Sequence, residues 1–259
     1  MAGTAGPGPE PQTGGPKAEP GFDLIWVRQA RGAREKRPAL SREQVVQAAI
    51  ELADERGLEG MSTRRIAARL GAGATSMYWH VPSKDDLYEL MFDAAMGELE
   101  LPEQPSGEWR ADLRTLARLA HALFGRHRWL VLLGIQPGIG PNTRRYGEFG
   151  IAALAGLGIG REHAVGVLAM VNNYVFGFAH RQTAWEQLRR RAGFTEQDWA
   201  DRLERYLAQA RREDPELARD IETRMRLASE DSFESGLQCL IEGIAVRLGQ
   251  AVSAPDGSR

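Results

Sequence analysis

The feature that most constrains the fold is a pair of short helical segments joined by a glycine-containing turn. Apolar side chains recur at helical spacing between Thr63 and Leu70, and Gly71 can end this segment because glycine tolerates a positive φ angle. A second short segment follows at residues 74–80, and Pro82 cannot continue it because proline lacks an amide hydrogen. This spacing is typical of a helix-turn-helix, whose second helix enters the DNA major groove. The same spacing also fits two helices of an ordinary core.

The second segment carries side chains suited to DNA. Met77 is expected to turn inward, while the opposite face presents polar and aromatic groups. Hydroxyl, indole, imidazole and ammonium groups can donate hydrogen bonds to phosphate oxygens, and small side chains can approach base edges. The candidate DNA-binding residues here are Ala74, Thr75, Ser76, Tyr78, Trp79, His80 and Lys84. The alternative is that Tyr78 and Trp79 only seal the core of a small domain.

Helical patterns extend over the rest of the chain. Ser41 and Gln44 form a capping box at the start of a helix expected over residues 42–56, which Gly57 would end. Further helices are expected from Ser83 to about Leu99, over residues 162–190 and over residues 229–249. No convincing alternating strand pattern is found, so an all-α fold is predicted.

The charge distribution separates the N-terminal part from the rest. The formal net charge of -2 argues against a protein that packages nucleic acid through a uniformly basic surface. Arginines and lysines nevertheless cluster over residues 28–37, where a basic arm that follows a minor groove and a solvated linker are both compatible with the pattern. Residues 1–21 are rich in glycine and proline, so residues 1–37 are predicted to form a disordered tail and the basic arm.

Composition also limits location and chemistry. A hydrophobic content of 42% over 259 residues can supply a sizeable core. Neither a run of 18 apolar residues nor a secretory signal is recognisable, so a cytoplasmic protein that does not span a membrane is expected. The single cysteine, Cys239, allows no internal disulfide and no CxxC site, and is expected to be a buried structural residue. No metal site and no cofactor are predicted.

Residues 40–91, from LSREQ to LYELM, resemble the DNA-binding domain of the TetR family of transcriptional repressors. The segment YWHV at residues 78–81 is close to the tetracycline-repressor-like subfamily, and FESGL with IEGI at residues 233–244 resembles the last helix of its C-terminal domain. The resemblance implies a three-helix DNA-binding domain of helix-turn-helix type over residues 38–100. A larger helical domain for effector binding and dimerisation is implied over residues 101–250, with a disordered tail over residues 251–259.

The resemblance also implies individual DNA contacts. The residues it places at the DNA are Thr63, Arg64, Tyr78, His80 and Lys84. The first two would open the first helix of the motif, with Arg64 able to pair with a guanine through two hydrogen bonds, and the last three would bind phosphates. Ala74 and Thr75 stand where tetracycline-binding members have glutamine and proline. An operator other than the tetracycline operator is therefore expected.

A further implication of the family is an effector cavity in the C-terminal domain. Tetracycline-binding members hold a magnesium ion through a histidine and a glutamate, but Leu132 and Arg181 stand at those places here, so that effector is not expected. The residues expected to line the cavity are Leu116, Ala120, Leu132, Ile135, Leu168 and Asn172. They carry one amide among apolar groups, which favours an apolar or weakly polar organic effector. An ordinary packed core explains the same residues.

A palindromic operator requires two recognition helices about 34 Å apart, so a homodimer is expected. Its interface is placed on the helix over residues 162–190 and on the final helix. The contact residues expected on the final helix are Phe233, Gly236, Leu237, Leu240 and Ile244. The effector-free dimer would bind operator DNA and block transcription, and ligand binding would shift the helix that begins at Ser83 and release the operator. Activation in place of repression stays open.

Two other classes of function fit parts of the sequence. An enzyme would draw on the histidines, but no HExxH, GxSxG, P-loop or GxGxxG motif is found in a suitable context. The histidines considered are His121, His127, His163 and His180, and they are expected to be surface or pocket residues. The other alternative is a helical interaction protein that has lost DNA binding.

Overall fold

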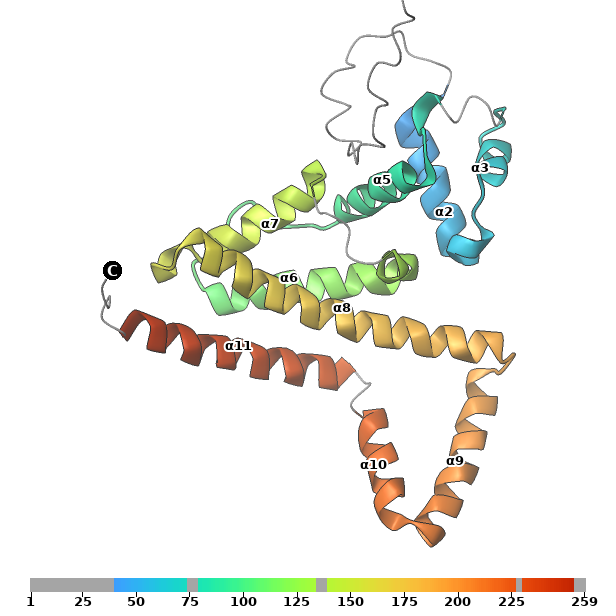
Figure 1. Ribbon diagram of the computed structural model, residues 1–259, viewed down its shortest axis with the longest axis vertical. Helices are drawn as coiled ribbons and strands as arrows, with labels where there is room; N and C mark the ends of the chain where they lie inside the picture. Colours follow the sequence, from blue (N-terminus) through green and yellow to red (C-terminus); the bar gives the residue numbers. More distant parts are fainter. Residues whose placement is uncertain (1–39, 74–78, 134–138, 227–229, 254–259) are drawn as a thin grey trace, which may run out of the picture. The chain divides into compact units, whose positions relative to one another are not determined.

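The computed structural model describes residues 40–73, 79–133, 139–226 and 230–253, all within one compact unit, Lys36–Arg259 (Figure 1). These residues are mostly helical and contain no strand, which confirms the predicted all-α fold. The elements are α2 (Arg42–Gly60), α3 (Thr63–Arg69), α5 (Lys84–Met96), α6 (Trp109–Arg126), the 3-10 helix η1 (Arg128–Leu132), α7 (Pro141–Ala153), the 3-10 helix η2 (Ala155–Leu157), α8 (Arg161–Arg191), α9 (Glu196–Glu213), α10 (Pro215–Arg226) and α11 (Glu230–Ser253).

Helices α2 and α3 open the helix-turn-helix region. The predicted capping box is confirmed, because the Gln44 amide donates to Ser41 Oγ at 3.2 Å and the Ser41 amide donates to the Gln44 side chain at 2.8 Å. Gly57 (φ 70°, ψ 172°) interrupts the helix at the position predicted from sequence, and a further short helical stretch beyond this kink carries α2 to Gly60. Ser62 caps α3, and the turn after it contains Gly71 with a φ of 63°, as the sequence predicts.

Most of the predicted third helix, residues 74–80, lies outside the described residues. Its last two residues, Trp79 and His80, are helical, and Val81 behind them is buried. Arg42 Nε donates to the His80 carbonyl oxygen at 3.1 Å. The end of this segment is thereby held against the start of α2. The predicted tail and basic arm over residues 1–37 also fall outside the described residues.

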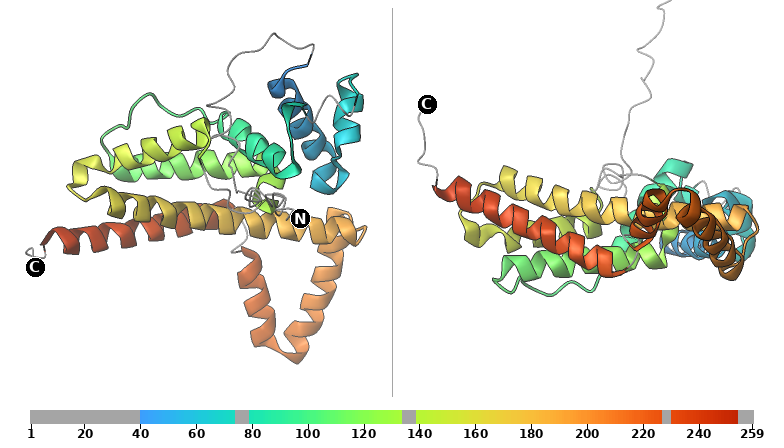
Figure 2. Two further views of the ribbon diagram at one scale, coloured as in Figure 1. Left: turned by 45° about the horizontal axis from the view of Figure 1, so that its top comes forward. Right: turned by 90° about the horizontal axis from the view of Figure 1, so that it is seen from below.

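The C-terminal helices form a layered core. Helices α6, α7 and α8 contact one another, and α11 contacts both α6 and α8, as two views of the ribbon show (Figures 1 and 2). Helix α8 matches the helix predicted over residues 162–190, and α11 matches the one predicted over residues 229–249. Because α11 continues to Ser253, the prediction of a disordered tail from residue 251 is wrong for residues 251–253, and residues 254–259 lie outside the described part.

Helices α9 and α10 form a hairpin that projects from the end of α8 (Figure 2). The break predicted at Asp214 and Pro215 is the turn of this hairpin. Arg211 joins the region through ion pairs with Glu204 at 3.0 Å and with Glu222 of α10 at 2.7 Å. The two helices are therefore tied to each other by charge as well as by packing.

Two expectations drawn from composition can be compared with these helices. In the described ranges, no helix is long and apolar enough to cross a membrane. The expectation of a buried cysteine is wrong, since Cys239 is exposed on α11. Leu237 and Ile241 of α11 are fully buried. Cys239 lies two positions from each of them and therefore faces the opposite side of the helix.

A buried carboxylate joins α5 to the start of α7. Asp93 is 3% exposed and accepts hydrogen bonds from the amide and the hydroxyl of Thr143, both at 2.9 Å, and from the Asn142 side chain at 3.0 Å. Gly140 precedes α7 so close to Asp93 that a Cβ atom there would overlap the carboxylate. The charge thus lies at the N-terminal end of α7, where free amides and the helix dipole favour an anion.

We expect Asp93→Ala to lower the free energy of unfolding by about 2–4 kcal/mol, because it leaves buried donors at the start of α7 without an acceptor. Urea denaturation followed by circular dichroism measures this loss. Asp85→Ala, in the exposed first turn of α5, is the matched control and should cost less than about 1 kcal/mol. Equal losses in the two variants would contradict the anchoring role of Asp93.

Candidate DNA interface and effector cavity

The described part of the helix-turn-helix presents an exposed tryptophan. The Trp79 side chain is 85% exposed, so it does not seal the core of the small domain. Arg64 and Lys84 are also exposed, whereas Thr63 and His80 are half-buried. The remaining predicted DNA-binding residues, Ala74, Thr75, Ser76 and Tyr78, lie outside the described residues. An exposed large aromatic side chain and exposed cations at the predicted positions are the chemistry expected of a surface that binds a polyanion.

Two interactions set the charge of this surface. A hydrogen bond with Tyr88 raises the pKa of the Lys84 ammonium, so Lys84 is positively charged at neutral pH. Arg69, at the end of α3, is instead held by Glu55 at 2.6 Å and by Glu51 at 3.4 Å. The charge of Arg69 is therefore neutralised within the domain. Among the predicted DNA-binding residues that the structure describes, Arg64 and Lys84 are the exposed arginine and lysine.

Three of the six residues predicted to line an effector cavity are core residues. Leu116, Ala120 and Leu168 are buried, and a Cβ atom on Gly150 of α7 would collide with Leu168. Helix α7 therefore packs closely on α6 and α8 at this point and fills the space that the sequence assigned to a ligand. This part of the prediction is not supported, because apolar spacing cannot distinguish a filled core from a cavity.

The other three predicted cavity residues differ from one another in their surroundings. The Asn172 side chain accepts a hydrogen bond from Tyr146 Oη at 2.7 Å, and burial raises the pKa of the Tyr146 hydroxyl. Leu132 is 40% exposed at the end of η1. Ile135 is outside the described residues.

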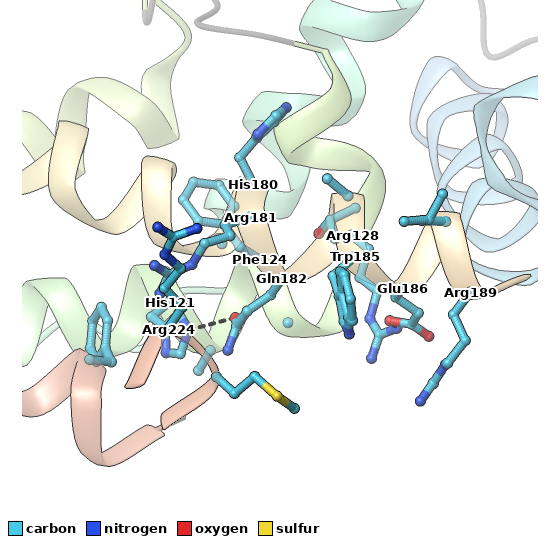
Figure 3. Close-up of a pocket in the computed structure, with 18 of the residues that line it drawn as sticks. His121, Phe124, Arg128, His180, Arg181, Gln182, Trp185, Glu186, Arg189 and Arg224 are labelled. Atoms are coloured by element: carbon cyan, nitrogen blue, oxygen red, sulfur yellow. Dashed lines mark hydrogen bonds and ion pairs between the residues drawn. The ribbon is translucent and has the colours of Figure 1, made fainter. Parts of the chain in front are cut away.

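The structure contains a cavity of about 1440 Å³ elsewhere, between α6, α8, α10 and α11 (Figure 3). None of the six predicted residues lines it. Its walls combine aromatic rings with arginines, and the lining includes Arg118, His121, Phe124, Arg128, Arg181, Gln182, Trp185, Glu186, Arg189, Arg224, Phe233 and Glu234. Its lining includes five arginines and three glutamates, so the wall is cationic although the whole chain has a net charge of -2.

Ion pairs hold several of these arginines in place. Arg118 of α6 pairs with Glu234 of α11 at 2.7 Å, and this contact lowers the pKa of the Glu234 carboxyl. Arg128 pairs with Glu186 of α8. Burial and the like charges of neighbouring arginines on α8 nevertheless lower the pKa of the Arg128 guanidinium. Positive charge is thus concentrated around Arg128 beyond what Glu186 neutralises.

Aromatic rings form the other part of the wall. His121 stacks on Phe233 with 4.1 Å between ring centroids, and its Nε2 atom lies 3.1 Å from Gln182 Oε1. Because the amide oxygen can only accept, His121 Nε2 carries the proton in this contact. Trp185 is 47% exposed and meets Trp199 of α9 edge to face at 4.7 Å. These planar groups offer faces on which a flat ligand can stack.

Helix η1 connects this cavity to the N-terminal domain. Arg128 lines the cavity, while the residues on either side of it reach Asp54 of α2. Trp129 Nε1 donates to Asp54 Oδ1 at 2.7 Å, and His127 Nδ1 lies 2.8 Å from the same oxygen. His127 Nε2 lies 3.0 Å from Glu98, which follows α5. The three consecutive residues 127–129 therefore contact the cavity, helix α2 of the DNA-binding domain and the segment that follows α5, the helix that we call the connecting helix.

Sequence reasoning did not find this connection. His127 was considered only as a surface or pocket residue, whereas it is 8% exposed and bridges two carboxylates. A signal was present in the run His127-Arg128-Trp129, where three side chains with N–H donors interrupt an apolar stretch. Their acceptors are far away in the sequence, so no local pattern could identify them.

The residues predicted for a dimer interface are mostly internal to the protomer. Phe233, Leu237 and Ile244 are at most 4% exposed, since they pack inside one protomer, where α11 contacts α6 and α8. Gly236 lies against Tyr174 of α8, and Leu240 is half-buried. These side chains cannot be the main contact with a partner. The periodicity identified the apolar face of α11 but not which chain covers it.

The outer faces of α8 and α11 are instead rich in small and apolar residues. The exposed residues at helical spacing are Val165, Gly166, Ala169, Met170, Asn173 and Gly177 on α8, and Cys239, Gly243 and Val246 on α11. We call this set the α8–α11 stripe. Small residues allow two helices to approach closely. In the part of the chain that the structure covers, no group of three or more His, Cys, Asp or Glu side chains could hold a metal ion.

Comparisons with known proteins match both parts of the chain. Residues 45–91 match the family of bacterial regulatory proteins, tetR family, and residues 101–248 match the tetracyclin repressor-like, C-terminal domain. The HTH-type transcriptional repressor DrrR1 of Streptomyces coeruleorubidus is 34% identical over 235 residues, covering 88% of this chain and 86% of that protein. An HTH-type transcriptional regulator of Saccharopolyspora erythraea is 40% identical over 163 residues, covering 62% of this chain and 68% of that protein.

Solved structures agree with these matches. Apo ActR of Streptomyces coelicolor aligns with a TM-score of 0.65 at 28% identity, covering 83% of this chain and 100% of ActR. The structure of ActR in complex with actinorhodin aligns with a TM-score of 0.65 at 29% identity, with the same coverage. The relatives regulate transcription, which decides against the enzyme considered as an alternative.

We expect Trp79→Ala to weaken binding of the protein to its DNA site by at least about tenfold, because an indole N–H and a large contact surface are lost. The free energy of unfolding should stay unchanged, since the side chain is 85% exposed. Fluorescence anisotropy with labelled DNA and urea denaturation measure the two quantities. Trp185→Ala, which removes an exposed tryptophan of the cavity, is the control and should leave DNA affinity unaltered. A loss of stability equal to the loss of affinity would make Trp79 a structural residue.

Proposed function

Because the chain belongs to the TetR family of bacterial regulatory proteins, we propose that it is a ligand-responsive transcriptional repressor that binds a palindromic operator as a homodimer. In this proposal Arg64 and the small residues Ala74 and Thr75 read bases, and Tyr78, His80 and Lys84 bind phosphates. Ser76, Thr63 and Trp79 complete the DNA-binding surface. The protein acts in the cytoplasm, where its operator is located.

The observation that carries the ligand response is the double-sided position of η1. Arg128 is part of the cavity wall, and its neighbours His127 and Trp129 bond to Asp54 in the DNA-binding domain. A ligand that displaces Arg128 from Glu186 moves the same short helix that holds α2. ActR, with the same fold, has been solved in complex with actinorhodin, which supports a small organic molecule as the effector. The effector releases the operator.

The energy needed for this release is small. Each 1.4 kcal/mol changes an equilibrium constant tenfold, so an effector that favours the released state by about 3 kcal/mol weakens operator binding on the order of 100-fold. Helix α5 carries the change, because Asp93 ties it to α7 and Glu98 ties its end to His127. A shift of η1 is thus passed to the connecting helix and to α2 together.

The proposed homodimer uses the α8–α11 stripe in place of the predicted contact residues. Two copies of α8 and α11 would form a four-helix contact, which small residues such as Gly166, Ala169 and Gly243 permit. The contact is isologous, as a two-fold operator requires. Two reading heads then face DNA about one helical turn, roughly 34 Å, apart.

Operator binding itself is tested by capturing fragments of the producing genome with the purified full-length protein and sequencing them. A sequence-specific set of fragments that share a palindrome is expected, with a footprint centred on it. Capture that depends only on fragment length and salt would mean non-specific binding and would contradict the repressor function.

We expect Gly243→Arg to convert the dimer to a monomer and to weaken operator binding by at least about 100-fold, because half-sites are no longer bound together. Open space surrounds Gly243 in the protomer, so the arginine does not prevent folding. Sedimentation velocity and DNA-binding titrations measure the two effects. Gly147→Arg, at an equally open position on α7, is the control. A dimeric Gly243→Arg protein with normal operator affinity would place the interface elsewhere.

The role of Asp54 is tested by a double-mutant cycle with Trp129. We expect Asp54→Ala and Trp129→Phe each to change operator affinity about fivefold or more, since either one breaks the bond between η1 and α2. The double variant should be no worse than the stronger single variant. Glu55→Ala is the control, because Glu55 pairs with Arg69 inside the DNA-binding domain. Fully additive effects would show that the contact does not couple the two domains.

A further inference from the structure

We propose that the cavity between α6, α8, α10 and α11 binds a flat aromatic molecule that carries an acidic group, in place of the apolar or weakly polar effector expected from sequence. This inference rests on the proposed ligand response for its biological role, but the binding itself is a property of the cavity. Three properties of the cavity support it, namely the charge of the wall, the aromatic rings of the wall and the size of the space.

The first property is the excess of guanidinium groups on the cavity wall. Arg118, Arg128 and Arg189 each have a glutamate within 4.0 Å, at Glu234, Glu186 and Glu196. Arg224 of α10 pairs with no carboxylate in the described part of the chain. A neutral ligand would shield such a guanidinium from water without replacing its hydration, which is costly. An acidic ligand can accept two parallel hydrogen bonds from it.

The second property is the position of the cations relative to the aromatic rings. Arg181 lies over the face of Phe178, with its guanidinium carbon 4.8 Å from the ring centroid. Figure 3 shows Arg181, His121 and Arg224 toward one end of the cavity, with Trp185 farther along α8 in the direction of Arg189. A planar ligand that stacks on Trp185 can therefore reach a guanidinium with an acidic substituent. Stacking and charge pairing act on one molecule at the same time.

The third property is the size of the cavity. A volume of about 1440 Å³ exceeds what a small carboxylic acid occupies and is sufficient for a molecule of several fused rings. Small inorganic anions would leave the stacked His121 and Phe233 wall and the half-exposed Trp185 without contact. The combination of space, rings and arginines is specific for a large aromatic anion.

The test uses two probes with the same rings and different charge. 8-Anilinonaphthalene-1-sulfonate is an aromatic anion, and N-phenyl-1-naphthylamine is the same molecule without the sulfonate. We expect the full-length protein to bind the sulfonate at least about tenfold more tightly, measured by probe fluorescence, with a preference that decreases as salt increases. Equal affinities, or tighter binding of the neutral probe, would overturn the inference.

Variants locate the site. Arg224→Gln and Arg181→Gln should each weaken binding of the sulfonate about fivefold to tenfold and leave binding of the neutral probe unchanged. Arg219→Gln, on an exposed position of α10 outside the cavity, is the matched control and should change neither. Unchanged sulfonate binding in both cavity variants would overturn the inference. Circular dichroism and thermal unfolding confirm that each variant is folded.

The same proteins separate this inference from the proposed function. Charge-selective binding that depends on Arg224 supports the inference whether or not operator DNA is bound. Failure of the unliganded protein to bind operator DNA would count against the repressor function alone. Release of the operator by the sulfonate, and not by the neutral probe, would support both.

Discussion

Asp54 of α2 accepts hydrogen bonds from His127 and Trp129, and this contact joins the DNA-binding domain to the C-terminal helices. An element whose position is affected at two sites can couple those sites. Here that element is η1, because Arg128 faces the cavity while the adjacent side chains hold α2. The side chains of His127 and Trp129 are buried, whereas the Asp54 side chain that accepts from them is 32% exposed. A rigid link of this kind transmits small displacements.

Two carboxylates, one on helix α5 and one directly after it, bind the C-terminal domain, and this makes α5 suited to connect the two domains. Asp93 lies at the N-terminal end of α7, and Glu98 bonds to His127 after the helix ends. A helix fixed by a buried carboxylate at one point cannot bend freely there, so motion of η1 relative to α7 must rotate or translate it as a body. The two anchors lie on different elements of the C-terminal domain. In the proposed mechanism, relative movement of those elements would be converted into movement of the DNA-binding domain.

The sequence predicted local features well and long-range ones poorly, for a physical reason. The Ser41 capping box, the Gly71 turn and the spans of α8 and α11 depend on neighbouring residues, and the structure agrees with them. The face of α11 that carries Leu237 was correctly identified as apolar, but the partner that covers it is the same chain. Likewise, Leu116 and Leu168 fill a core because Gly150 lets α7 come close. Periodicity reports which side chains avoid water and not what they meet.

The cavity illustrates why local charge matters more than net charge. Five arginines in a DNA-binding protein could attract nucleic acid to the wrong surface. Glutamates on the same wall, such as Glu186 and Glu234, neutralise part of this charge when no ligand is present. In the proposed mechanism, a bound anion competes with them for the guanidinium groups, and release of Arg128 from Glu186 moves η1. The carboxylates would therefore weaken binding of nucleic-acid phosphates in the cavity. Because an anion must displace Glu186 from Arg128, occupation of the cavity would also change the position of η1 and its contact with Asp54.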